Sequence, residues 1–330
     1  MKPLIGIHHV TAITSSAEKI YQFFTYILGI RLVKKTINQD DIHTYHLFFA
    51  DDEGRAGTDM TFFDFPGSTK AIKGTNEIAK TGFRVPSNQA IHYWKKRFEK
   101  LQVRHKSIER KFGRLTLEFN DFDDQEYVLF SDENTQGSIR GTPWKKGPIP
   151  NEYGITGLGP IFFRVNQLEL MDHVLTHHLT FHKIDEHDHE HLYETGDGGN
   201  GSSIIIIDQP NAIPARQGYG GVHHVAFGVH DDEEIYAWIK HLSEMRAPHS
   251  GYVDRFYFHS LYTRLYPGIL FEFATLGPGF IDDEESYETL GETLALPPRF
   301  RNNRAHIESL VRPIDTKRSH LVFEKEYMED

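Results

Sequence analysis

The residues of this chain that are best suited to chemistry are two His-His pairs in matching sequence contexts. The pairs are His8-His9 and His223-His224. Each lies in a short apolar run rich in β-branched residues, over 6–14 and 221–229, and each run precedes a helical pattern. Imidazole is a common ligand of transition metals. One such pair would indicate packed core histidines, but two copies at matching places indicate a shared site.

A carboxylate in another apolar stretch completes a set of candidate metal ligands. Glu272 lies in the run 269–275, where a buried carboxylate is costly unless it is paired or binds a cation. At the corresponding place in the first unit stands Thr61, which is no anionic ligand. His9, His224 and Glu272 match the ligand set of non-haem Fe(II) oxygenases, which leaves positions open for substrate and O₂. The alternative is a core glutamate bonded to a backbone amide, beside two packed histidines.

Strand alternation assigns the neighbours of these ligands to faces. If His9 and His224 point inward, Thr11 does too, whereas His8 and His223 begin on the opposite face. From the pattern alone, His8 and His223 either reach the site from the edge of a barrel or support the sheet.

The elements that position these residues form an internal repeat of a β-α-β-β-β module. The expected modules are residues 1–70, 75–135, 152–210 and 218–280, with a linker at 136–151 and a tail with a helix at 290–330. Aligning the ends of the four first strands places His9, Lys80, Pro160 and His224 at one structural position. We therefore expect an α+β fold of two barrel-like domains, in which the first and fourth modules share the metal site.

Within the modules, periodicity and turn residues predict the individual elements. Helices are expected from Ser15 or Ser16 to Gly29, and near 87–101, 167–179, 231 onward and 302–311. Besides the four first strands, strands are expected near 30–36, 43–50, 58–65, 103–108, 113–119, 126–131, 203–208, 250–258, 260–266 and 269–275.

The composition restricts the classes of partner. The chain has 330 residues and a formal net charge of −11, which disfavours nucleic acids and anionic membranes. It has no cysteine, so disulfides and thiolate ligands are excluded. No apolar run approaches the roughly 18 residues of a membrane helix, and no signal peptide is expected at the start. A cytoplasmic protein fits these features, and its 21 histidines favour metal chemistry.

Two other motifs are given less weight. Residues 173–191 contain seven histidines but lie in the module without ligands, so they are interpreted as a solvated loop. Residues 196–201 are glycine-rich but precede a strand, and thus indicate a turn rather than a phosphate loop.

Several longer motifs make the chain recognisable. They are Leu28-Gly29-Ile30-Arg31-Leu32-Val33-Lys34-Lys35-Thr36, Asn38-Gln39-Asp40-Asp41, Tyr45-His46-Leu47-Phe48, Gly141-Thr142-Pro143-Trp144, Asp254-Arg255-x-Tyr257-Phe258, Tyr262-x-Arg264 and Leu296-Pro297-Pro298. With the four modules, they resemble the vicinal oxygen chelate superfamily of glyoxalases and extradiol dioxygenases, and within it the dioxygenases that cleave para-hydroquinone rings. The turn 265–268 departs from that pattern beside Glu272, which would alter the pocket rim.

The resemblance implies an active site shared by the first and fourth modules. It implies Fe(II), or Mn(II) as the alternative, on His9, His224 and Glu272. It also implies functional roles around the metal for His8, Thr11, His223, Arg255 and Tyr262. The partners would be a small aromatic diol and O₂, and a homo-oligomer is left open.

Two other functions remain in competition on the same scaffold. One is a metal-dependent isomerase or lyase of the glyoxalase type, which generally uses a second carboxylate where Thr61 stands. The other is a metal-free binding or resistance protein, which would have discarded the three ligands that this chain retains.

Overall fold

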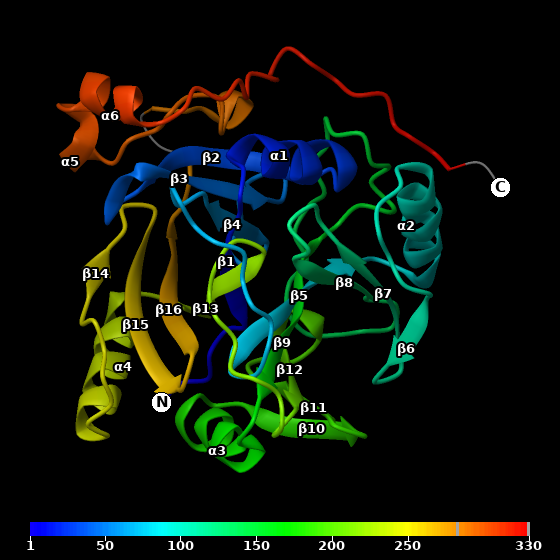
Figure 1. The fold of residues 1–330 in the computed structure, drawn as a ribbon, viewed down its shortest axis with the longest axis vertical. Coiled ribbons are helices and arrows are strands. Elements are labelled where there is room, and N and C mark those ends of the chain that lie inside the picture. The colour runs from blue at the N-terminus through cyan, green and yellow to red at the C-terminus, as the bar shows by residue number, and fades with distance from the viewer. Residues whose placement is uncertain (282–283, 329–330) are drawn as a thin grey trace.

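The computed structural model describes residues 1–281 and 284–328, and its strands form two eight-stranded sheets (Figure 1). The first sheet contains β1 (Ile7–Ile13), β2 (Arg31–Asn38), β3 (Asp41–Ala50), β4 (Asp59–Phe63), β13 (Gly221–Val229), β14 (Val253–Asp254), β15 (Phe258–Tyr266) and β16 (Ile269–Pro278). The second contains β5 (Glu77–Val85), β6 (Glu109–Lys111), β7 (Arg114–Asn120), β8 (Glu126–Ser131), β9 (Gly157–Val165), β10 (His182–His187), β11 (Glu190–Glu194) and β12 (Ser203–Asp208). Their orders are β14-β15-β16-β13-β1-β4-β3-β2 and β10-β11-β12-β9-β5-β8-β7-β6.

This strand order confirms the expected α+β fold of four modules. The first and fourth modules share the first sheet, and the second and third modules share the other. In each sheet the modules meet by antiparallel pairing of their first strands, β1 with β13 and β5 with β9. Each first strand also pairs in parallel with the last strand of its own module. Segments more than 200 positions apart are thereby brought into neighbouring strands at the centre of one sheet.

Short helices pack on the outer faces of the sheets. They are α1 (Ala17–Gln22), α2 (Asn88–Lys100), α3 (Leu168–His173), α4 (Asp232–Glu244), α5 (Pro298–Arg301) and α6 (Arg304–Leu310), and α1 and α3 continue as π-helical turns at Phe23–Ile27 and Val174–His178. Ser16 caps α1 as expected, since its Oγ accepts a hydrogen bond from Lys19 N (3.3 Å). On α4, Trp238 stacks on Phe273 of β16 with ring centroids 4.4 Å apart. Strand alternation then directs the neighbouring Glu272 to the inner face.

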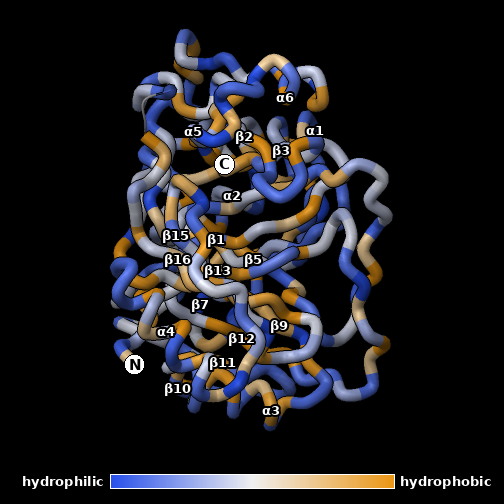
Figure 2. Tube along the Cα trace, turned by 90° about the vertical axis from the view of Figure 1, so that its left-hand side faces the viewer, coloured by the Kyte–Doolittle hydropathy of each residue, from blue (hydrophilic) through white to orange (hydrophobic). Residues whose placement is uncertain are grey.

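Hydrophobic segments follow the central strands, whereas many outer loops are hydrophilic (Figure 2). None of the described helices is long and apolar enough to cross a membrane.

The C-terminal segment, residues 284–328, runs over the first sheet and on to α2 of the other half (Figure 1). At its beginning, Glu285 accepts a 2.7 Å hydrogen bond from Lys34 of β2, and both side chains are fully buried. At its end, Glu326 pairs with Arg97 of α2 at 2.7 Å. The segment thus ties the two halves together and holds β2 in place.

Three expectations about local structure were wrong. Residues 103–108, all of them described, form no strand, because the chain turns after α2 at Gln102, which has φ +56°, and Val103 N bonds back to Phe98 O (2.9 Å). The expected strand at 250–258 is reduced to the two residues of β14. The histidine-rich residues 173–191 are not one solvated loop, since they extend from α3 through β10 into β11. Only β10 is fully exposed, whereas pairing of β11 with the buried strand β12 buries His191.

Candidate metal centre

Three side chains from adjacent strands converge at the centre of the first sheet. His9 Nε2 lies 3.1 Å from Glu272 Oε2, His224 Nε2 lies 2.9 Å from the same oxygen, and the two Nε2 atoms are 3.3 Å apart. All three residues are buried. Among the residues that the structure describes, His9, His224 and Glu272 form the group of three side chains whose ligand atoms lie close enough together to hold one ion.

Strand register explains why these three residues meet. On the antiparallel pair β1–β13, Thr11 lies opposite His224, and on the parallel pair β13–β16, Ala226 lies opposite Glu272. Side chains two positions apart on a strand point to the same face. His9, His224 and Glu272 therefore project from the inner face at neighbouring points of three strands.

His8 and His223 lie behind the two ligand histidines and set their orientation. His8 Nε2 is 3.0 Å from the backbone oxygen of Thr275, to which it must donate, and its Nδ1 is 2.9 Å from His9 Nδ1. His223 Nδ1 is likewise 2.8 Å from His224 Nδ1. Burial, and then the adjacent ligand histidine, lowers the pKa of both His8 and His223 to about 3. Both are neutral near pH 7. His8 therefore accepts Nδ1–H from His9, and because His223 and His224 repeat this geometry, we assign the same direction to their hydrogen bond.

This proton arrangement leaves three bare acceptor atoms facing one another. A neutral His9 or His224 that donates from Nδ1 turns a lone pair on Nε2 toward Glu272. Glu272 Oε2 is buried and receives no hydrogen bond from the residues that the structure describes. Burial raises the pKa of Glu272, and only a positive charge or a hydrogen-bond donor on the side of His9 and His224 holds it well below its ordinary range. The site therefore requires a positive charge beside this carboxylate.

The separations fit side chains that would share one metal ion. Ligand atoms about 2.1 Å from an ion lie about 3.0 to 3.4 Å from one another at octahedral to tetrahedral angles. The three observed separations are 2.9, 3.1 and 3.3 Å. The donor set and its spacing thus fit a divalent cation with three protein ligands.

Ser260 is a supporting residue that the sequence analysis missed. Its hydroxyl donates a 2.6 Å hydrogen bond to Glu272 Oε1, which leaves Oε2 to face the histidines. Ser260 lies on β15 two residues before Tyr262, which pairs with Glu272. The alternation of β15 could have placed Ser260 on the inner face, but a single serine carries no signal of its partner.

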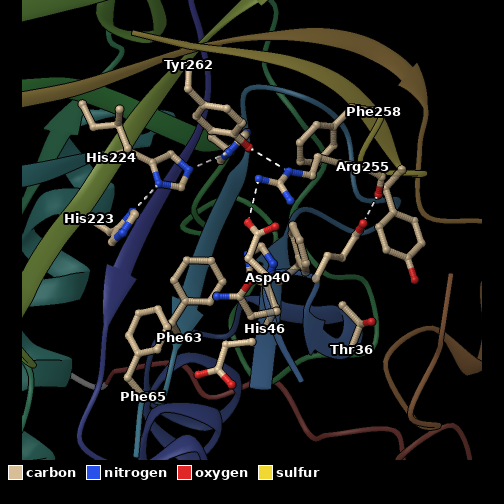
Figure 3. A pocket seen from close by; sticks show the side chains of 17 residues that line it. Thr36, Asp40, His46, Phe63, Phe65, His223, His224, Arg255, Phe258 and Tyr262 are labelled. Atoms are coloured by element: carbon tan, nitrogen blue, oxygen red, sulfur yellow. Dashed lines mark hydrogen bonds and ion pairs between the residues drawn. The ribbon is translucent and has the colours of Figure 1, made fainter. Parts of the chain in front are cut away.

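A cavity of about 380 Å³ opens beside the three ligands (Figure 3). Its lining comprises His9, His224, His223, Arg255, Tyr262, Thr36, Asn38, Gln39, Asp40, Asp41, His46, Phe48, Phe63, Phe65, Tyr257, Phe258 and Leu270. The expected site residues His223, Arg255 and Tyr262 are thus brought to the cavity wall. His8 and Thr11 are not among the lining residues, and they contact His9 and Thr61, respectively. The divergent turn 265–268 does not line the cavity, since Gly268 packs against Asn76 instead.

Arg255 and Tyr262 form a hydrogen-bonded pair at the wall (Figure 3). Arg255 Nε donates to the Tyr262 hydroxyl at 3.2 Å, and Arg255 Nη2 pairs with Asp40 at 3.0 Å. Burial, followed by the charge of Glu272, raises the pKa of Tyr262. The hydroxyl is therefore protonated near pH 7, and since its oxygen accepts from Arg255, its hydrogen is free to be donated.

Thr11 faces inward as expected, but its hydroxyl belongs to a chain of polar contacts with Thr61 and His46. Its Oγ1 is 2.7 Å from Thr61 Oγ1, which is in turn 2.9 Å from His46 Nε2. Thr61 occupies the position that corresponds to Glu272, because Thr11 lies opposite Thr61 just as Ala226 lies opposite Glu272. The structure therefore provides no second carboxylate ligand at that position.

The chain has close relatives among curated proteins. It is 44% identical over 314 residues to MhqA of Bacillus subtilis (strain 168), named as a ring-cleaving dioxygenase, with 94% of this chain and 98% of the relative covered. It is 29% identical over 304 residues to the chlorohydroquinone/hydroquinone 1,2-dioxygenase of Sphingobium indicum, with 89% and 92% covered. No family model matches the chain.

Solved structures have the same architecture. A crystal structure of a dioxygenase from Bacillus subtilis superposes with a TM-score of 0.87 at 31% identity, covering 96% of this chain and 99% of that one. Glyoxalase I from Zea mays superposes with a TM-score of 0.57 at 12% identity, covering 82% and 92%, and shares the fold alone.

Proposed function

This chain belongs to the ring-cleaving dioxygenases of the vicinal oxygen chelate superfamily, and on that premise we propose that it opens the ring of a hydroquinone-like diol. The observation that carries the proposal is the convergence of His9, His224 and Glu272 on one point at an aromatic cavity. A substrate and O₂ together need open positions on the ion, and three protein ligands leave them.

Fe(II) is favoured because two imidazoles and one carboxylate with open positions are typical of non-haem iron oxygenases, and Mn(II) is the alternative. When bound, the ion supplies the redox chemistry that joins O₂ to an electron-rich ring. The residues of the chain bind the diol, orient it and exclude water from it.

Orientation of the diol depends on side chains, because a para-diol reaches the metal through one oxygen only. Tyr262 donates its free hydrogen to that phenolic oxygen, and Arg255 fixes the tyrosine. His223 accepts at Nδ1 from His224 and, when neutral, carries its proton on Nε2. It therefore serves as a hydrogen-bond donor at the cavity wall.

The remaining cavity wall suits a neutral aromatic ring. Four phenylalanines contribute to it, Phe48, Phe63, Phe65 and Phe258. Asp40 already neutralises Arg255 at 3.0 Å, so the cavity offers no unpaired arginine to an anionic substituent. These features favour diols whose other substituents are small and uncharged.

A metal-dependent isomerase or lyase remains the second candidate function. In this chain, Thr61 stands where such a site would use a second carboxylate, and its hydroxyl is engaged by Thr11 and His46. This difference favours ring cleavage over isomerisation.

The function is tested with protein loaded anaerobically with Fe(II) and then exposed to oxygen and hydroquinone. We expect oxygen uptake by the wild type and a loss of about 100-fold in turnover for Tyr262→Phe, with iron retained, since one well-placed donor is removed. The matched control is Tyr45→Phe, because the Tyr45 hydroxyl donates to Arg312 O away from the cavity. A wild type that consumes no oxygen with any hydroquinone would refute the function.

A further inference from the structure

In both modules of the first sheet, a polar side chain on the neighbouring strand contacts the last-strand residue, which is Glu272 in one module and Thr61 in the other. In the fourth module, Ser260 lies opposite Ala274, two residues after Glu272, and donates to Glu272. In the first module, His46 lies opposite Phe63, two residues after Thr61, and its Nε2 is 2.9 Å from Thr61 Oγ1. His46 thus occupies the register position of Ser260, but it is a larger group and reaches the cavity.

His46 has polar capacity that the protein does not use. Its ring lies against Phe48 and Phe63, with centroids 3.9 and 4.4 Å away, so its orientation is fixed. Nε2 is engaged with Thr61, and among the described residues no hydrogen bond involves Nδ1. Burial, and then the nearby His9, lowers the pKa of His46 well below its ordinary value. The ring is neutral near pH 7, and Nδ1 either donates or accepts, depending on the tautomer.

A second unused polar atom lies on the neighbouring strand. Thr36 of β2 pairs directly with His46 of β3, and both line the cavity. Thr36 is 1% exposed, and its Oγ1 has no hydrogen-bond partner among the residues that the structure describes. Figure 3 shows Thr36 and His46 together, on the side of the cavity away from His224 and Tyr262. A buried hydroxyl without a partner is costly, and a ligand that bonds it recovers that cost.

We propose that His46 and Thr36 form a subsite for the hydroxyl of the diol that does not bind the metal. This inference rests on the proposed function and adds the recognition of the second oxygen. A neutral hydroxyl donates one hydrogen bond and accepts another, so it satisfies Thr36 Oγ1 and His46 Nδ1 together. An ether, a methyl group or a bare ring edge at that position cannot do both, and the subsite therefore selects para-diols over simple phenols.

The test compares anaerobic binding of hydroquinone and of phenol to Fe(II)-loaded protein by calorimetry, so that it does not depend on turnover. For the wild type we expect hydroquinone to bind about 10-fold more tightly than phenol. Thr36→Val, which removes only the hydroxyl, should reduce this preference several-fold without changing phenol affinity, whereas Thr36→Ser should keep it.

A second pair of variants tests which of the two ring nitrogens of His46 contributes to binding of the diol. An asparagine amide reaches about as far as Nδ1, and a glutamine amide about as far as Nε2. His46→Asn should therefore retain more of the preference for hydroquinone than His46→Gln. If His46 only supported Thr61 through Nε2, the order of the two variants would be reversed. Iron content and the unfolding midpoint, measured for all four variants, verify that each retains the fold and the metal.

The outcomes separate this inference from the function on which it rests. Oxygen uptake with hydroquinone, but no preference for hydroquinone over phenol, would overturn the subsite and leave ring cleavage standing. Equal losses of hydroquinone and phenol affinity in Thr36→Val would also overturn it. A wild type that binds hydroquinone with the expected preference but consumes no oxygen would instead overturn ring cleavage.

Discussion

The two sheets of this protein share one topology and place different chemistry at equivalent points. In each module, the residue two positions after the aligned first-strand residue lies opposite one residue of the last strand. These register pairs are Thr11–Thr61, Ala226–Glu272, Gly82–Val128 and Phe162–Ile205. The first sheet therefore has His9, His224, Glu272 and Thr61 where the second has Lys80, Pro160, Ile205 and Val128.

The second sheet also carries a mostly buried carboxylate, but it supplies its own cation. Lys80 Nζ lies 2.8 Å from Glu118 Oε1 and also stands over the ring of Phe162. Around Val128 and Ile205 the interior is closed by apolar side chains. In the first sheet, Glu272 faces two neutral imidazoles instead. The same backbone therefore gives a packed core where a lysine of the chain supplies the cation, and a candidate metal centre where no side chain does.

The largest effect should come from removing the charge of Glu272. Glu272→Gln keeps the shape of the side chain but no longer offers an anion, so metal affinity should fall by more than about 100-fold. Glu118→Gln is the matched change in the second sheet and should retain one equivalent of iron. Iron content after dialysis against a weak chelator measures both. Equal iron content in the two variants would contradict the proposed difference between the two sheets.

A smaller loss is expected when the support of the carboxylate is removed. Ser260→Ala deletes the 2.6 Å hydrogen bond to Glu272 Oε1, and the metal affinity should fall by about 10-fold. Thr116 is the control, because it lies opposite Phe130 at the register position of Ser260 in the second sheet. Competition between the protein and a fluorescent chelator compares Ser260→Ala with Thr116→Ala. If both variants keep the wild-type affinity, Ser260 has no part in the metal site.

The smallest effect concerns the dependence of stability on pH. Burial, and then His9, lowers the pKa of His8 to about 3 in the folded protein, whereas an unfolded chain has a histidine pKa of about 6.5. The unfolded state therefore binds the proton first as the pH falls. The contribution of His8 is fully present above about pH 6.5 and is lost toward pH 3, by at most about 1.4 kcal/mol per pH unit.

Urea unfolding of the metal-free protein between about pH 6.5 and pH 5.5 measures this contribution. His8→Gln can still donate to Thr275 O but does not titrate, so its free energy of unfolding should fall by about 1 kcal/mol less than that of the wild type. Identical slopes in the two proteins would contradict the neutral, proton-accepting state of His8. The chain of hydrogen bonds to His9 would then need another assignment.

The sequence by itself determined the repeat and the three metal-ligand candidates. Strand periodicity is local, and the His-His pairs recur at the same place in two modules, so His9 and His224 could be aligned without coordinates. Glu272 was identifiable because a carboxylate in an apolar strand needs a cation. The motifs around Arg255 and Tyr262 added the family resemblance, and the structure then placed both residues at the cavity.

Only the tertiary structure decided how the remaining residues serve the site. The roles of His8 and His223 depend on ring nitrogens that meet a carbonyl or another imidazole, and strand alternation alone left those roles open. Ser260 gave no signal, and His46 and Thr36 stood in the family motifs without an assigned role, because each derives its role from a partner on a neighbouring strand. Local patterns specify which face a side chain occupies, but register and side-chain direction between distant strands decide which atoms meet.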